Sequence, residues 1–157
     1  AEMCNALGFK VIILSKSFEG IKNDYPKYES VYLTQLLEAA DIISFHCKPP
    51  LDGSPIIATN EINQMKKSSI IINTARGNLV SEIDLSEAIK NKTIKGAAID
   101  VFADEPAHDN ILFGLDNVIL TPHIAASTSE SQIIVAEMVA NQFVDYFLRD
   151  KVNNAVI

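Results

Sequence analysis

The sequence has little cysteine, no long hydrophobic run and fewer basic than acidic residues, and each shortage excludes a class of protein. Cys4 and Cys47 are too few and too far apart for a disulfide framework or a zinc site, so no metal is expected. No apolar stretch approaches the ~18 residues that a membrane-spanning helix needs. The formal charge of -7 disfavours binding to nucleic acid or to an anionic membrane. The first residues also lack a signal-peptide pattern, so a reduced, cytoplasmic protein is expected.

Length and hydrophobic content favour a single α/β domain. A chain of 157 residues with 48% hydrophobic content suffices for a packed core. Short, continuously apolar runs alternate with helical patterns, which is typical of a parallel sheet covered on both faces. Strands are expected at 11–14, 41–46, 70–73, 96–101 and 118–120.

Helical patterns lie between these strands and after the last one. Helices are expected over 31–40 and 59–65, and Ser81-x-x-Asp84 forms a capping box that begins a third. Ser127-x-x-Glu130 predicts the start of a long final helix. The side of that helix expected to be buried carries seven apolar residues: Ile134, Val135, Met138, Val139, Phe143, Tyr146 and Phe147.

Three of the predicted strands end in a turn with one chemically useful side chain. Arg76 follows the strand at 70–73, Glu105 follows the strand at 96–101, and His123 follows the strand at 118–120. In an open α/β sheet, ligands bind beyond the carboxyl ends of the strands. A guanidinium, a carboxylate and an imidazole from three strand ends are therefore predicted to form one site.

The sequence around these residues resembles the D-isomer-specific 2-hydroxyacid dehydrogenases. The matching motifs, in order, are Asn73-Thr-Ala-Arg-Gly-x-Leu-Val80, Asp100-Val-Phe-x-x-Glu-Pro106 and Thr121-Pro-His-Ile-Ala125. The segment 153–156 favours the phosphoglycerate dehydrogenase branch. The resemblance implies a Rossmann-like, doubly wound parallel sheet, with a dinucleotide-binding domain at 1–149 and a tail at 150–157 leading back to a substrate domain.

The resemblance also implies that part of the domain lies outside the sequence. In this family a G-x-G-x-x-G loop and the strand before it should precede Ala1. We therefore expect an N-terminally incomplete fragment with a gap in the middle of its sheet. Such a fragment is expected to be inactive by itself.

For a dehydrogenase of this family, the resemblance assigns a role to each residue of the site. His123 would be the acid–base group, since a histidine titrates near neutrality, and Glu105 would orient its ring and favour imidazolium. Arg76 would grip the substrate carboxylate in bidentate fashion. The cofactor would contact the following positions: Ser15, Lys16, Cys47, Thr74, Ala75, Asp100, His123 and Ala125.

The end of the strand at 11–14 bears on the type of cofactor. NAD-using members carry an acid there that binds the ribose hydroxyls. This chain has Ser15 and Lys16 instead, which favours the 2′-phosphate of NADP over NAD. Glu19 and Asp24 are nearby acids that a shifted loop could bring to the ribose.

Other functions and a partner also have to be considered. The predicted substrates are phosphoglycerate, hydroxypyruvate or glyoxylate-type acids. A catalytically silent dinucleotide-binding or regulatory module is the first rival. A formate dehydrogenase is the second, and Glu105 argues against it, because those enzymes lack the glutamate. A homodimer is expected, with the loop 104–113 and the helix after Glu130 as contact regions.

Overall fold

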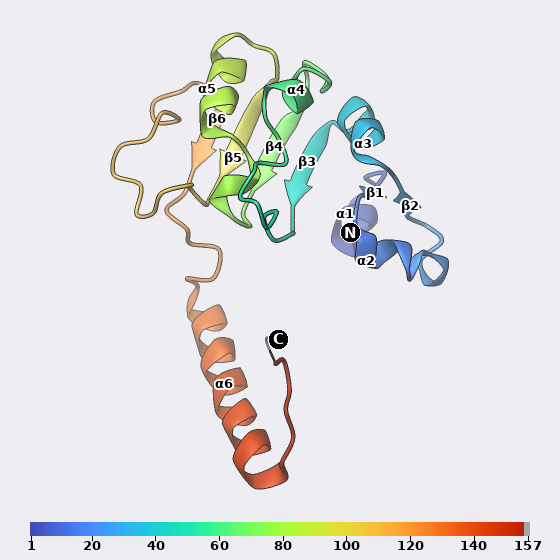
Figure 1. Ribbon diagram of the computed structural model, residues 1–157, viewed down its shortest axis with the longest axis vertical. Helices are drawn as coiled ribbons and strands as arrows, with labels where there is room; N and C mark the ends of the chain where they lie inside the picture. Colours follow the sequence, from blue (N-terminus) through green and yellow to red (C-terminus); the bar gives the residue numbers. More distant parts are fainter. Residues whose placement is uncertain (156–157) are drawn as a thin grey trace.

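The computed structural model describes residues 1–155, which form two parallel sheets (Figure 1). The smaller sheet pairs β1 (Ile12–Ile13) with β2 (Glu29–Ser30). The larger sheet has the order β3-β4-β5-β6. Its strands are β3 (Ile42–Phe45), β4 (Ile70–Asn73), β5 (Gly96–Ile99) and β6 (Val118–Leu120), all in parallel register. The predicted Rossmann-like α/β class is confirmed, and the sheet is interrupted between β1 and β3 in the described residues.

Helices connect the strands, mostly where they were predicted. They are α1 (Glu2–Ala6), α2 (Lys16–Glu19), α3 (Leu33–Ala39), α4 (Thr59–Ile62), α5 (Glu82–Lys90) and α6 (Ser129–Arg149), with 3-10 turns η1 (Lys22–Asp24) and η2 (Gly77–Leu79). Ser81 caps α5 as predicted, because its hydroxyl accepts from the Asp84 N–H. The cap of α6 is Thr128 rather than Ser127, since Thr128 Oγ1 accepts from the Ser131 N–H at 3.1 Å.

The hydrophobic core surrounds β4 and the inner face of α5. Ile71 of β4, Leu79 of η2 and Leu85 of α5 are completely buried. Burying side chains of this size contributes about 1.5–3 kcal/mol each relative to leaving them exposed. The carboxyl ends of β4 and β5 are thus held on a rigid base.

Two glycines allow backbone segments of this core to touch. A Cβ at Gly77 would lie 2.0 Å from the carbonyl carbon of Phe102, and one at Gly96 would lie 2.5 Å from the carbonyl oxygen of Asn117. Real Cβ atoms do not approach backbone so closely, so both positions require glycine. Gly96 thus allows the chain at Asn117 to approach the start of β5.

Helix α6 corrects one expectation about packing. It extends away from the four-stranded sheet (Figure 1), and none of its residues is buried. The seven residues expected on its buried side are at least 47% exposed in this structure: Ile134, Val135, Met138, Val139, Phe143, Tyr146 and Phe147. The pattern correctly predicted a helix, but its apolar side chains contact no core of the described residues.

The segment after α6 turns back along the helix. Asp150 ends α6 in a left-handed conformation, and the Asn153 side chain donates to Asp145 Oδ2 at 2.6 Å. The expected tail at 150–157 includes residues 156 and 157, which lie outside the described residues. Among the described helices, none combines the length and the apolar character that crossing a bilayer requires.

Candidate active site

The predicted site residues follow three adjacent strands of the larger sheet. Asn73 at the end of β4 is in register with Ile99 of β5, which is in register with Leu120 of β6. Because these strands are parallel, the turns that carry Arg76, Glu105 and His123 all leave the same edge of the sheet.

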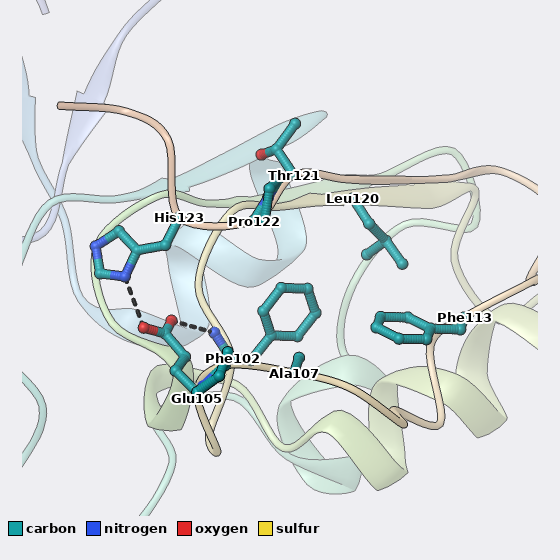
Figure 2. A pocket seen from close by; sticks show the side chains of 9 residues that line it. Phe102, Glu105, Ala107, Phe113, Leu120, Thr121, Pro122 and His123 are labelled. Atoms are coloured by element: carbon teal, nitrogen blue, oxygen red, sulfur yellow. Dashed lines mark hydrogen bonds and ion pairs between the residues drawn. The ribbon is translucent and has the colours of Figure 1, made fainter. Parts of the chain in front are cut away.

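His123 and Glu105 form a directly bonded pair (Figure 2). His123 Nδ1 lies 2.7 Å from Glu105 Oε2, and Glu105 Oε1 accepts from the Phe102 N–H at 2.9 Å. The hydrogen bond with His123, and next the one from Phe102, lower the pKa of Glu105 below its usual value. The carboxylate thus stays ionised, and it fixes the orientation of the imidazole ring.

The backbone at His123 has an uncommon conformation. Its φ is +53°, in the left-handed region that non-glycine residues seldom adopt. The His123 N–H donates to the Asp100 carbonyl at 2.8 Å, so the end of β5 holds this turn in place. Such backbone strain concentrates at functional sites.

Asp100 is the main link between β5 and the His123 turn. Its side chain accepts from Thr121 Oγ1 at 2.5 Å, from the Ile124 N–H at 2.9 Å and from the Ala125 N–H at 3.1 Å. Burial, with only 4% of the residue exposed, acts to raise the pKa of Asp100, but these hydrogen bonds outweigh it and the pKa is lowered. An ionised carboxylate offers about four acceptor positions, so one remains for a further donor.

Arg76 is exposed, and its turn is held by a buried amide. The Asn73 carboxamide donates to the Arg76 carbonyl at 2.8 Å and accepts from the Ala75 N–H at 3.1 Å. Asn73 is only 1% exposed, and no role was predicted for it from the sequence. The available signal was an amide at the last position of an apolar strand, where a buried polar group needs partners.

Two cavities lie at this edge. One of about 530 Å³ is lined by His123 and Glu105 together with apolar side chains such as Phe102, Phe113 and Leu120 (Figure 2). The other, of about 380 Å³, is lined by Phe45, His46, Cys47, Lys48, Thr74, Ala75 and Arg76. The structure therefore joins His123 to Glu105, and it gathers Arg76, Thr74, Ala75 and Cys47 around a second hollow.

Ser15 and Lys16 lie at the end of β1, in the smaller sheet. Ser15 caps α2 by accepting from the Phe18 N–H at 3.4 Å, while Lys16 is exposed. Glu19, the alternative acid for a ribose, already binds Lys22 and accepts from Ser30 Oγ at 2.6 Å. Those contacts, led by the one with Lys22, lower its pKa.

Residues 1–125 match the family described as D-isomer specific 2-hydroxyacid dehydrogenase, NAD binding domain. The chain belongs to this family. The α/β fold with its parallel sheet agrees with that assignment. Within residues 1–155, no cluster of three or more His, Cys, Asp or Glu side chains could hold a metal ion.

Individual relatives are similar along nearly the whole chain. A glycerate dehydrogenase of Methylorubrum extorquens is 37% identical, over 99% of this chain and 48% of its own length. A D-3-phosphoglycerate dehydrogenase of Archaeoglobus fulgidus is 36% identical, over 99% of this chain and 30% of its own length. The structure of an acyclic imino acid reductase in complex with NADPH and D-Arg superposes with a TM-score of 0.87 at 33% identity, covering 99% of this chain and 48% of that one. The chain thus spans half or less of the length of these relatives.

Proposed function

We propose that the protein transfers a hydride between a nicotinamide cofactor and a D-2-hydroxy acid. The observation that carries this proposal is the hydrogen bond between His123 Nδ1 and Glu105 Oε2. It lies beyond the carboxyl ends of the parallel strands, in a chain that belongs to this family. Its relatives include a glycerate dehydrogenase and a D-3-phosphoglycerate dehydrogenase. The substrate class is therefore a small 2-hydroxy acid or the matching 2-oxo acid.

His123 supplies the proton transfer. Because Nδ1 is engaged with Glu105, Nε2 is the ring nitrogen that takes the proton of the substrate hydroxyl during oxidation and returns it during reduction. The ionised Glu105 stabilises the imidazolium that forms, as the acid does in other His–acid pairs. General acid–base catalysis by a positioned side chain is typically worth about 10²–10⁴-fold in rate.

Arg76 binds the substrate carboxylate. A guanidinium can form two parallel hydrogen bonds to a carboxylate, and Arg76 is exposed, with the Asn73 amide holding its backbone. In this structure its Nη1 donates to the Ala75 carbonyl at 2.6 Å. That contact uses one of the five N–H donors of the guanidinium, so the others remain for the substrate carboxylate.

The residues at the strand ends suit a nicotinamide dinucleotide, which accepts or gives the hydride when bound. Asp100 has one acceptor position left for the carboxamide of the ring. Thr74, Ala75 and Cys47 line the cavity of about 380 Å³ that would hold part of the cofactor. Ala125 would contact it from the His123 turn.

The choice between NAD and NADP rests on the end of β1. Ser15 and the exposed Lys16 replace an acid with a neutral and a positive side chain, which favours the 2′-phosphate of NADP. A Lys16→Glu variant of the intact protein should bind NADPH more weakly and NADH no more weakly than the wild type. Tighter binding of NADH than of NADPH by the wild type would overturn this choice.

Steady-state assays of the intact protein test the proposed activity. Hydroxypyruvate, glyoxylate and phosphohydroxypyruvate should each be tried with NADH and with NADPH. Turnover of at least one of them, reduced by about 10²–10⁴-fold in a His123→Asn variant, is the expected result. Cofactor binding without turnover of any of these acids would favour a silent dinucleotide-binding module instead. Sedimentation of the same sample tests the proposed homodimer.

A further inference from the structure

Glu82, the first residue of α5, makes two side-chain hydrogen bonds outside its own helix. Its Oε1 accepts from the Ala103 N–H at 2.9 Å, and its Oε2 accepts from Asn110 Nδ2 at 2.8 Å. Ser81 already caps this helix terminus. The carboxylate of Glu82 therefore holds both ends of the loop 103–110, which lies 21 to 28 residues further along the chain.

Glu105 lies within this loop, close to its Ala103 end. The Phe102 N–H donates to Glu105 Oε1, and the next N–H, that of Ala103, donates to Glu82 Oε1. Two carboxylates thus accept from successive peptide groups. A shift of the Ala103 peptide moves the Phe102 peptide, and with it the carboxylate that orients His123.

The other end of the loop is fastened to the core. Asn110 Oδ1 accepts from the Leu112 N–H at 3.0 Å, and Leu112 is completely buried. The carboxamide of Asn110 uses its donor toward Glu82 and its acceptor toward Leu112. Its orientation is therefore fixed, and it connects Glu82 to the core.

The Arg76 turn packs against the same part of the loop. A Cβ at Gly77 would lie 2.0 Å from the Phe102 carbonyl carbon and 2.4 Å from the Ala103 nitrogen. The peptide between Phe102 and Ala103 is therefore the surface on which the turn bearing Arg76 meets the loop bearing Glu105. Glu82 hydrogen-bonds the N–H of that same peptide.

We infer that Glu82 is a positioning residue, whose carboxylate keeps Glu105 aligned with His123 and with the Arg76 turn. It acts through the Ala103 and Phe102 peptides, and its effect on turnover rests on the proposed function. A displacement of about 1 Å at a catalytic group can cost 10²-fold in rate. A Glu82→Gln variant should therefore lose about tenfold to a hundredfold in kcat, with its cofactor dissociation constant unchanged.

A swap of hydrogen-bond polarity tests the role of this contact. In Glu82→Gln, the new NH₂ group faces the NH₂ group of Asn110, so two hydrogen-bond donors oppose each other. In Asn110→Asp, the carboxylate of Asp faces the carboxylate of Glu82, so two acceptors oppose each other. The double variant Glu82→Gln/Asn110→Asp lets Gln donate to Asp and restores the connection. It should recover kcat to within about threefold of wild type, which a purely local loss of stability would not do. Glu87→Gln, on the exposed face of α5, removes the same charge and should leave kcat unchanged.

A spectroscopic measurement separates this inference from the proposed activity. The ¹⁵N resonance of His123 Nδ1 reports its bond to Glu105, and with only three histidines it can be assigned from variants of His46 and His108. It should shift in Glu82→Gln and return in the double variant, whether or not the protein turns over any acid tested. An unshifted resonance in Glu82→Gln, or a double variant no closer to wild type than Glu82→Gln, would overturn the role of Glu82. If the wild type turned over none of the acids tested, the proposed function would be overturned instead.

Discussion

At the scale of single residues, the pairing of His123 and Glu105 gives the sharpest prediction. Glu105→Gln keeps the shape of the side chain but removes the charge that stabilises imidazolium. His123→Asn removes the proton-transferring nitrogen altogether. We expect kcat/KM to fall by about 10²–10⁴-fold in His123→Asn and by less in Glu105→Gln. Steady-state kinetics of the intact protein measure both, and a Glu105→Gln enzyme as active as wild type would contradict the assigned role.

Asp100 gives a prediction about stability and pH. The pKa of Asp100 is lower in the folded protein than the ordinary pKa of an aspartate, ~3.9. Ionised Asp100 therefore stabilises the fold at pH values above that ordinary pKa, and this contribution disappears as the pH falls through the lowered pKa of the folded protein. The Tm of the wild type should therefore drop between about pH 5 and pH 3, and that of Asp100→Asn should drop less steeply. Calorimetry across this range measures the slopes. Asp104→Asn, which removes the same charge from an exposed position, should keep the slope of the wild type.

The sequence predicted the candidate catalytic residues better than the residues whose hydrogen bonds keep them in position. His123 and Glu105 stand out because each follows an apolar strand in a matched motif. The contacts of Asn73 are local, with the Ala75 N–H and the Arg76 carbonyl, and an amide at the end of an apolar strand was a usable signal for them. The partners of Glu82 lie 21 and 28 residues further along the chain, in a loop whose course depends on tertiary packing, so spacing along the chain could not reveal Glu82.

At the scale of elements, the close contact of η2 with the Glu105 loop predicts that one added methyl group strongly destabilises the fold. Gly77→Ala places its Cβ 2.0 Å from backbone atoms of Phe102, so the two segments must separate. Overpacking a core typically lowers the free energy of unfolding by about 1–3 kcal/mol. Because the atoms that the new Cβ would meet are backbone atoms, the loss at this site should be at least at the upper end of that range. Denaturant unfolding of the variant measures the loss. Gly20→Ala is the control, because its Cβ would meet only the Ser17 carbonyl at an ordinary 3.6 Å, and a similar loss there would contradict the argument.

Strands with strong apolar runs were located to within one or two residues, whereas β2 was not predicted. Residues 70–73 were expected as a strand and form β4, since four consecutive apolar or amide positions fit a sheet buried on both faces. Glu29 and Ser30 of β2 carry no such signal. They pair with Ile12 and Ile13 because tertiary structure brings them there, which local propensity cannot indicate.

At the scale of the whole molecule, α6 determines how residues 1–157 behave when isolated. Phe143 and Phe147 are 61% and 69% exposed and stack on each other at 6.0 Å. Exposed apolar patches of this kind drive association. Sedimentation of the isolated segment should therefore show concentration-dependent self-association, reduced in Phe143→Ser/Phe147→Ser but not in Leu51→Ser, which changes an exposed loop. A monomer at every concentration would contradict this expectation.

The packing of α6 also marks the limit of what the amino-acid pattern could predict. Its apolar residues indicated a helix with a face to bury, and the helix is present. A periodic pattern indicates that one face of the helix is apolar and has to be buried, but it does not indicate which segment packs against that face. The described residues leave that face open.

Strand β3 has a further consequence for how the molecule assembles. Among the described residues it pairs with β4 alone, so one edge of Ile42–Phe45 presents unsatisfied main-chain groups. Such groups recognise any extended backbone, whatever its side chains. The first extended segment to arrive there captures the edge, whether it comes from the same polypeptide or from another molecule. In the isolated segment 1–157, this edge is therefore expected to pair with other molecules unless residues outside the segment cover it.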